Sequence, residues 1–226
     1  MSDAMRCVVF GASGGIGAEL CGQLAAAGHT VLRFSRSGAP AIDLTIEADV
    51  LRAAELAGGE LDRVIVASGF LHDADYAPEK TFRRLDPEQM VHSFFVNALG
   101  PALVLKHFAP LLAKKRKAVL AFLSARVGSI EDNRAGGWYS YRASKAALNQ
   151  IMRTAAIELA RTHPDGVCLS LHPGTVDTAL SQPFHRDRSG LQSPAQSAAA
   201  LLAVMESATP AQSGSFLDYA GQPIPF

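Results

Sequence analysis

A glycine-rich turn near the start of the chain constrains the fold more than any other feature. A continuous apolar run, residues 7–10, leads directly into Gly11-Ala12-Ser13-Gly14-Gly15-Ile16-Gly17, and a helical pattern follows over residues 16–27. A short run that is apolar at every position is typical of a strand buried on both faces of a parallel sheet. The turn therefore predicts a central strand that passes into a helix at one edge of such a sheet.

The glycines of this turn suit a bound anion. A pyrophosphate has to approach the backbone closely, which a β-carbon would prevent, and glycine also accepts the positive φ of a tight turn. The amide groups at the start of the helix then face the anion, assisted by the helix dipole. A plain strand-to-helix turn is the alternative, but the flanking strand and helix favour a dinucleotide site. The predicted site consists of Gly11, Ser13, Gly14, Gly15, Ile16 and Gly17.

Short apolar runs alternate with helical patterns along the remaining chain, which indicates an α/β fold with a mostly parallel sheet and flanking helices. Further strands are expected at residues 30–35, 41–44, 63–68, 118–123, 167–171 and 215–218. Further helices are expected at residues 47–57, 86–114 with a break near Gly100-Pro101, 141–161, and from Ser193 onward. Asp86 and Ser193 are predicted N-caps, with Gln89 and Gln196 reaching back. Because no linker divides residues 1–226, we expect one domain.

The composition narrows the range of partners. Lysine plus arginine number 21, as do aspartate plus glutamate, so the balanced charge gives no reason to expect nucleic acid or an anionic membrane. Three scattered cysteines, Cys7, Cys21 and Cys168, form no disulfide or metal-ligand pattern and fit a reducing compartment. Neither a signal peptide nor a run of about 20 apolar residues is apparent. We expect a cytoplasmic protein without a bound metal.

The end of the second strand bears on the choice of dinucleotide. NAD sites place an acidic residue there for the ribose hydroxyls, whereas an arginine accommodates the 2′-phosphate of NADP. This chain has Ser35 and Arg36 at that point, and a guanidinium pairs with phosphate through two parallel hydrogen bonds. NADP(H) is therefore favoured over NAD(H), with Ser13 as an added hydroxyl contact; a solvated surface arginine is the alternative. Asp43 is expected near the adenine or, alternatively, in a simple turn.

Tyr141 and Lys145 stand four residues apart in a predicted helix. This spacing places both side chains on one face. A phenol has an ordinary pKa near 10, and a neighbouring ammonium favours the phenolate. The pair therefore suits acid–base chemistry, although an exposed helix turn would carry the same residues.

These motifs together resemble the short-chain dehydrogenase/reductase family of the compact type. Gly11, Gly15 and Gly17 match its GxxxGxG pattern, and Tyr141 with Lys145 its YxxxK motif. Ser124 falls at the active-site serine and Asn97 at the asparagine of the long helix. The Pro-Gly segment after the sixth strand, whose threonine contacts the carboxamide side of the nicotinamide, corresponds to Pro173, Gly174, Val176 and Thr178.

The resemblance implies a Rossmann doubly wound sheet of about seven strands in the order 3-2-1-4-5-6-7. It also implies hydride transfer between a nicotinamide and a carbonyl or alcohol. Tyr141 would donate the proton, Ser124 would hydrogen-bond the substrate oxygen, Lys145 would bind the nicotinamide ribose, and Asn97 would hold a relaying water. Residues 179–193 are expected to form a substrate lid. The helices carrying Asn97 and Tyr141 are expected to pair across a two-fold axis in a homodimer or homotetramer.

Two departures from the family pattern leave alternatives open. Val66-Ala67-Ser68-Gly69 replaces the usual Asn-Asn-Ala-Gly, so Ala67, Ser68 and Gly69 are expected to line the cofactor without the asparagine. Ser124 lies far from Tyr141 for this family, which leaves Ser129 as a second candidate. The runs at residues 124–129, 136–141 and 213–226 resemble the C-factor subgroup, so a dinucleotide-binding signalling protein with little turnover is the alternative function. Trp138 lines the substrate pocket or anchors its loop. An extended-type epimerase is disfavoured by length.

Overall fold

A six-stranded parallel sheet forms the centre of the computed structural model, which describes residues 4–184 and 189–226. The strand order is β2-β1-β3-β4-β5-β6, and every neighbouring pair is parallel. The strands are β1 (Arg6–Phe10), β2 (Thr30–Phe34), β3 (Arg63–Val66), β4 (Ala118–Leu123), β5 (Gly166–His172) and β6 (Phe216–Asp218). The predicted doubly wound α/β fold is confirmed.

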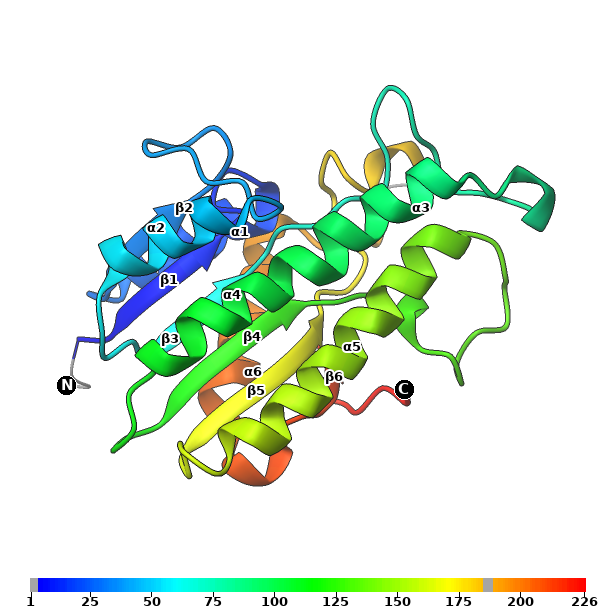
Figure 1. Cartoon of the computed structure of the whole chain (residues 1–226). Coiled ribbons are helices and arrows are strands. Elements are labelled where there is room, and N and C mark those ends of the chain that lie inside the picture. Colours follow the sequence, from blue (N-terminus) through cyan, green and yellow to red (C-terminus); the bar gives the residue numbers. More distant parts are fainter. Residues whose placement is uncertain (1–3, 185–188) are drawn as a thin grey trace.

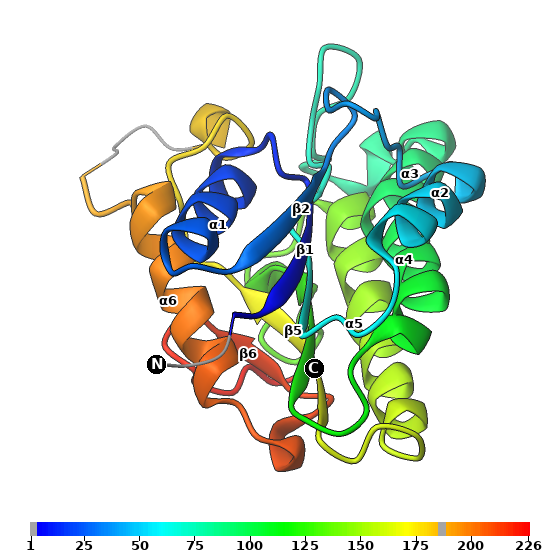
Figure 2. The same cartoon turned by 90° about the vertical axis from the view of Figure 1, so that its left-hand side faces the viewer.

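Helices cover both faces of the sheet. They are α1 (Gly15–Ala26), α2 (Glu47–Ala57), α3 (Pro87–Phe94), α4 (Gly100–Phe108), α5 (Tyr139–Leu159) and α6 (Pro194–Ser207). Figure 1 shows α3, α4 and α5 running across one face, and Figure 2 shows α1 and α6 on the other. This three-layer arrangement requires strands that are apolar on both sides.

The alternation of side chains along β1 builds two separate cores. Val8 and Phe10 pack in the cluster beneath α2, α4 and α5. Cys7 and Val9 point the opposite way, into the cluster beneath α1 and α6. Because successive strand residues face opposite sides, an uninterrupted apolar run is what this sheet position demands.

The long helical region is one continuous stretch with an altered central turn. A π-helical turn, η2 (Phe95–Leu99), joins α3 to α4 where a break near Gly100-Pro101 was expected. Asp86 caps α3 as predicted, because its Oδ1 accepts from the amide of Gln89 at 2.9 Å. The Gln89 side chain does not reach back, since it donates to the carbonyl of Ala77. The capping box at Ser193 and Gln196 is complete.

The same region is more apolar than we expected, because no stretch that could span a membrane was apparent in the sequence. Residues Pro87–Leu111 are long and apolar enough, by length and composition alone, to cross a membrane. In the structure, however, α3 and α4 pack against α5 and α2 on one face of the sheet. The apolar character therefore serves helix packing, although part of it faces outward.

The predicted third strand at residues 41–44 is absent. Only a single parallel bridge between Ser35 and Ala41 marks the place, so the sheet has six strands in place of about seven. Ile42 and Leu44 are nevertheless buried in the core beneath α2 and α4. The apolar residues that suggested a strand are therefore core residues of a buried loop.

The strand order reverses beside β1. The chain leaves β1 toward β2 on one side and later returns to β3 on the other. In open parallel sheets, ligands bind beyond the carboxyl ends of the strands where the order reverses in this way. The glycine-rich turn lies at this point.

Candidate active site

The glycine-rich turn is packed too closely for side chains at two positions. A β-carbon on Gly17 would lie 2.1 Å from the carbonyl oxygen of Gly11, and one on Gly11 would lie 2.7 Å from the amide of Ser68. Gly11 also has a φ of 75°. The turn therefore requires glycine there, which brings the end of β1 against the end of β3.

The start of α1 offers a site for an anion. Gly14 caps the helix without a side-chain hydrogen bond, and the first turn holds no acidic residue. Ser13, Gly14 and Gly15 are exposed. Exposed amides and the helix dipole together favour a phosphate, so the residues present fit the pyrophosphate of a dinucleotide.

Ala67 and Ser68 lie beside this turn, whereas Gly69 lies beside Asn97 and Lys145; that the three residues line the cofactor stays a prediction. The Ala67 amide donates to the Phe10 carbonyl at 2.9 Å, which extends the β1–β3 pairing. Among the described residues, the buried hydroxyl of Ser68 is one of six side-chain atoms or groups that lack a hydrogen-bond partner. A buried unpaired hydroxyl is costly, and a cofactor hydroxyl or phosphate bound beside the turn would satisfy it.

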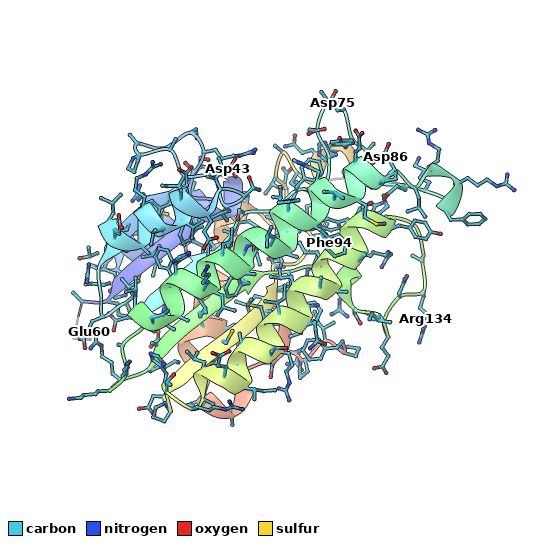
Figure 3. The ribbon with its side chains drawn as sticks, in the orientation of Figure 1. Asp43, Glu60, Asp75, Asp86, Phe94 and Arg134 are labelled. Carbon is cyan, nitrogen blue, oxygen red and sulfur yellow. The ribbon has the colours of Figure 1, made fainter. Side chains whose placement is uncertain are left out.

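Arg36 is exposed just beyond β2. The neighbouring turn is tied to the glycine loop, because the Ala12 amide donates to the Phe34 carbonyl at 3.1 Å. The Asp43 carboxylate accepts from the amide and hydroxyl of Thr45 at 2.8 and 2.7 Å. These bonds and the charge of Arg36 hold the pKa of Asp43 below its usual value against an opposing effect of burial. Asp43, labelled in Figure 3, thus has the contacts of a turn residue.

Tyr141 and Lys145 occupy one face of the first turns of α5. The Lys145 Nζ lies 5.8 Å from the centre of the Tyr141 ring and donates to the carbonyl of Leu123, at the end of β4, at 2.8 Å. Lys145 is only 3% exposed, and burial lowers its pKa to about 8. Burial raises the pKa of the Tyr141 phenol above its usual value. That direction is opposite to the expected one, because the cause that acts on the phenol is its desolvation by burial.

Asn97 lies in the π-helical turn and is fully buried. Its Oδ1 accepts from the Phe70 amide at 2.8 Å, and its Nδ2 donates to the Phe70 carbonyl at 2.8 Å and the Ser144 hydroxyl at 3.1 Å. A β-carbon on Gly69 would lie 3.6 Å from both Asn97 Oδ1 and Lys145 Nζ. Asn97 therefore fastens the segment after β3 to α5, while the relaying water stays a prediction.

Both serine candidates are buried after β4. The Ser124 hydroxyl donates to Asn149 Oδ1 at 2.7 Å, and Asn149 Nδ2 has no partner among the described residues. The Ser129 hydroxyl accepts from the Asp132 amide at 3.0 Å. Ser124 is thus held against α5, a contact that its position after β4 did not predict.

The segment after β5 approaches the glycine turn. A β-carbon on Gly15 would lie 3.0 Å from Cγ2 of Thr178. The Pro173 carbonyl accepts from Ser197 at 2.8 Å, and Val176, buried, bridges to Gln192. Gly174 has a φ of 84°. The predicted lid at 179–193 includes residues 185–188, which lie outside the described residues.

The sequence did not indicate a buried carboxylate in this region. Glu79 is 3% exposed, and its carboxylate accepts from the amide and hydroxyl of Ser140 at the start of α5. The two residues are 61 positions apart, so no local pattern links them. Within residues 4–184 and 189–226, no group of three or more His, Cys, Asp or Glu is arranged to hold a metal ion.

The family model described as short chain dehydrogenase matches residues 41–189, a span that contains Asn97, Tyr141 and Lys145. The chain belongs to the short-chain dehydrogenase family. As a short-chain dehydrogenase, it is an NAD(P)-dependent oxidoreductase.

The proteins to which this short-chain dehydrogenase is similar carry different names. The chain is 36% identical over 157 residues to "C-signal" of Myxococcus xanthus, which covers 69% of this chain and 83% of that protein. It is 35% identical over 198 residues to "1-hydroxy-2-glutathionyl-2-methyl-3-butene dehydrogenase" of Rhodococcus sp., covering 85% and 79%. A short-chain dehydrogenase/reductase of Burkholderia multivorans with bound NADP has a similar structure, with a TM-score of 0.83 and 26% identity over 99% of this chain and all of that one.

Proposed function

We propose that this short-chain dehydrogenase reduces a carbonyl compound to an alcohol with NADPH. The observation that carries the proposal is the placement of Tyr141 and Lys145. Both lie on one face of α5, with the Lys145 ammonium beside Gly69 at the same edge of the sheet as the glycine turn. Similarity to a Rhodococcus protein named as the dehydrogenase of a 1-hydroxy compound supports this reaction class.

The cofactor, when bound, supplies the hydride. Tyr141 donates the proton to the substrate oxygen. A phenol is protonated at neutral pH, and burial raises the pKa of this one further, so Tyr141 is in the form that can act as the general acid of carbonyl reduction. Lys145, held by the Leu123 carbonyl, provides the positive charge beside the phenol and binds ribose hydroxyls.

Ser124 and Asn97 support this pair in different ways. Ser124 provides a second hydrogen bond to the substrate oxygen, which requires its hydroxyl to rotate away from Asn149. Asn97 fixes Phe70 and thereby the backbone beside Lys145. The cofactor residues are those of the glycine turn, Ala67 to Gly69, and Pro173, Gly174, Val176 and Thr178. Residues 179–193 close over the substrate in this one-domain chain.

NADP(H) is the proposed dinucleotide because Arg36 stands at the end of β2 with no carboxylate beside it in the chain. Asp43 lies on the adenine side. Similarity to a Burkholderia protein with bound NADP is consistent with this choice. The guanidinium would form paired hydrogen bonds to the 2′-phosphate.

A titration of the protein with NADPH and NADH tests the cofactor assignment. We expect tight binding of NADPH and weak binding of NADH, with the preference lost in Arg36→Ala and kept in Arg33→Ala. Arg33 is an exposed arginine of β2, the strand that Arg36 follows, so it controls for the loss of one surface charge. Equal binding of both dinucleotides would refute the assignment to NADP.

Turnover tests the reaction. With NADPH and a panel of aldehydes and ketones, we expect wild-type activity that falls about 10²- to 10⁴-fold in Tyr141→Phe, with NADPH binding unchanged. A dinucleotide-binding signalling protein is the second candidate, favoured by the similarity to C-signal. Binding of NADPH without turnover of any carbonyl would support that candidate.

We also propose a cytoplasmic homo-oligomer without nucleic acid or membrane as partner. The balanced charge and three buried free cysteines support this assignment. The two-fold contact would lie along an apolar groove of about 500 Å³ between α3, α4 and α5, into which Phe94 projects (Figure 3). The same helix face on two copies satisfies a two-fold interface.

A further inference from the structure

Three consecutive residues before α5 have left-handed backbone conformations. Gly136, Gly137 and Trp138 have φ values of 63°, 67° and 54°. Glycine adopts such angles readily, but a bulky residue does so only where its surroundings hold it there. Strain of this kind concentrates at functional sites, so the position of Trp138 needs a physical explanation.

Hydrogen bonds hold this turn from two sides. The Trp138 amide donates to the Glu79 carbonyl at 2.5 Å. The Arg142 guanidinium donates to the carbonyls of Gly137 at 2.9 Å and Gly136 at 3.2 Å. The left-handed turn is therefore clamped between the segment after β3 and the first turn of α5.

The buried carboxylate of Glu79 completes the clamp. Trp138 is the N-cap residue of α5, but its side chain accepts no hydrogen bond from the helix. The first turn of α5 has no acidic residue. The Glu79 carboxylate instead accepts from the Ser140 amide at 3.2 and 3.3 Å and from the Ser140 hydroxyl. Glu79 thus caps the helix that carries Tyr141 from a distant part of the chain.

The clamp places the indole between Tyr141 and the segment after β5. The Trp138 ring centre lies 6.2 Å from that of Tyr141 and 5.1 Å from that of Phe184, both in tilted, edge-on arrangements. Phe184 in turn packs 5.2 Å from the His72 ring. Aromatic rings at these distances attract one another, and together the rings of Trp138, Phe184 and His72 form an aromatic wall beside the phenol.

We propose that Trp138 is the specificity-determining residue of the site, selecting carbonyl compounds with a flat aromatic substituent, and that Glu79 is the positioning residue that holds it. This inference rests on the proposed function, because it takes Tyr141 as the proton donor. The indole stacks on the substituent while Tyr141 meets the carbonyl oxygen. Small aliphatic carbonyl compounds have no aromatic ring to stack on the indole, so this wall does not favour them as substrates.

The first test compares benzaldehyde with propanal as substrates. In Trp138→Ala we expect kcat/KM for benzaldehyde to fall about tenfold, the loss of one good aromatic contact, with propanal changed less than about threefold. Trp138→Phe should keep most of the selectivity. Trp138→Gly removes the indole and also relieves the left-handed backbone, so it should match Trp138→Ala in selectivity. Equal losses for both aldehydes would overturn the specificity role.

The second test uses Glu79→Ala, Glu79→Gln and the exposed neighbour Lys80→Ala. Trp138 is the only tryptophan of the chain, so its fluorescence reports directly on the indole. We expect Glu79→Ala to shift the emission to the red and to reduce selectivity for benzaldehyde as Trp138→Ala does. Glu79→Gln keeps an oxygen that accepts from Ser140 and should restore both properties, and Lys80→Ala should resemble the wild type.

The outcomes separate the inference from the proposed function. A purely structural Glu79 would lower the unfolding temperature and both kcat/KM values in parallel, leaving their ratio and the emission of the folded protein unchanged; that result overturns the positioning role. Wild-type turnover of both aldehydes with a ratio that no Trp138 variant alters overturns the inference alone. Turnover of other carbonyl compounds of the panel without turnover of benzaldehyde also overturns the inference alone. Absence of turnover with the whole carbonyl panel overturns the proposed function and the inference together.

Discussion

A single methyl group at Gly17 is enough to disrupt the glycine-rich turn. A β-carbon there would meet the Gly11 carbonyl at 2.1 Å, whereas one on Gly22, in the same helix, would meet nothing within 4 Å. These two glycines of α1 therefore differ in their effect. Gly17 is required because the backbone of Gly11 approaches it closely, whereas Gly22 only weakens the helix.

We expect Gly17→Ala to abolish dinucleotide binding and to destabilise the fold, because the backbone of the turn has to move. Gly22→Ala should stabilise the protein by about 1 kcal/mol and leave binding intact, since alanine is the better helix former. Chemical denaturation and NADPH titration of both variants check this pair. Normal NADPH affinity in a folded Gly17→Ala protein would contradict the assigned role of the turn.

We expect Lys145 to set the alkaline limit of the proposed activity. Its folded pKa of about 8 is below the ordinary value of 10.5 because the ammonium is buried. As pH rises through about 8, Lys145 loses its proton and the positive charge beside Tyr141 disappears. We expect kcat/KM for reduction to decline above this pH. In Lys145→Arg the residual activity should hold to above about pH 10, since a guanidinium stays charged; a decline near 8 in both proteins would rule out Lys145 as its source.

Among the elements, the π-helical turn η2 shows how a helix irregularity serves the site. It places Asn97 against the backbone of Phe70, 27 positions earlier in the chain. π-helical turns are rare and occur frequently at functional sites. The irregularity therefore joins the segment after β3 to the helix that carries Tyr141.

Asn97→Leu removes three hydrogen bonds, one buried and two partly buried, and leaves the amide and carbonyl of Phe70 unpaired. We expect a loss of about 3 kcal/mol in the free energy of unfolding together with a lower kcat, because the backbone beside Lys145 loses its support. Gln89→Leu, which removes one hydrogen bond to Ala77, is the milder control. Unchanged kcat in a destabilised Asn97→Leu protein would show that Asn97 contributes to stability alone and not to the proposed reaction.

The elements also show what sequence patterns capture. Most strands, the caps at Asp86 and Ser193, and the pair Tyr141–Lys145 follow from local periodicity and spacing, which depend on neighbouring residues. The expected strand at residues 41–44 failed because burial of Ile42 in a loop leaves the same apolar pattern as a strand. The contacts of Glu79 with Ser140 and of Ser124 with Asn149 join distant positions, so only the folded chain reveals them.

At the scale of the whole molecule, an apolar helix face remains uncovered in the monomer. Val91, Phe95 and Leu99 are 55%, 42% and 41% exposed along α3 and η2. Exposed apolar side chains that recur along one helix face are typical of an interaction surface. These three residues line the apolar groove between α3, α4 and α5 into which Phe94 projects.

We expect the wild type to sediment as a dimer or larger oligomer and Phe95→Glu to sediment as a monomer, because a buried unpaired charge is unfavourable. Ile130→Glu replaces an apolar residue that is 77% exposed on the loop after β4, away from the groove, and should leave the oligomer intact. Analytical ultracentrifugation distinguishes these outcomes. A monomeric wild type would contradict the proposed two-fold contact.

The order of the strands has a consequence for synthesis on the ribosome. β6 lies near the end of the chain and pairs with β5, and Arg126, in the loop after β4, contacts Asp218 of β6, so the nascent chain cannot complete the candidate site until nearly all of it has emerged. Parallel strands also need distant partners, which slows folding. Until β6 arrives, β5 presents an open edge to other chains. We therefore expect enzymatic activity to appear late in the synthesis of this protein. A truncated product that lacks β6 would be both inactive and prone to aggregate.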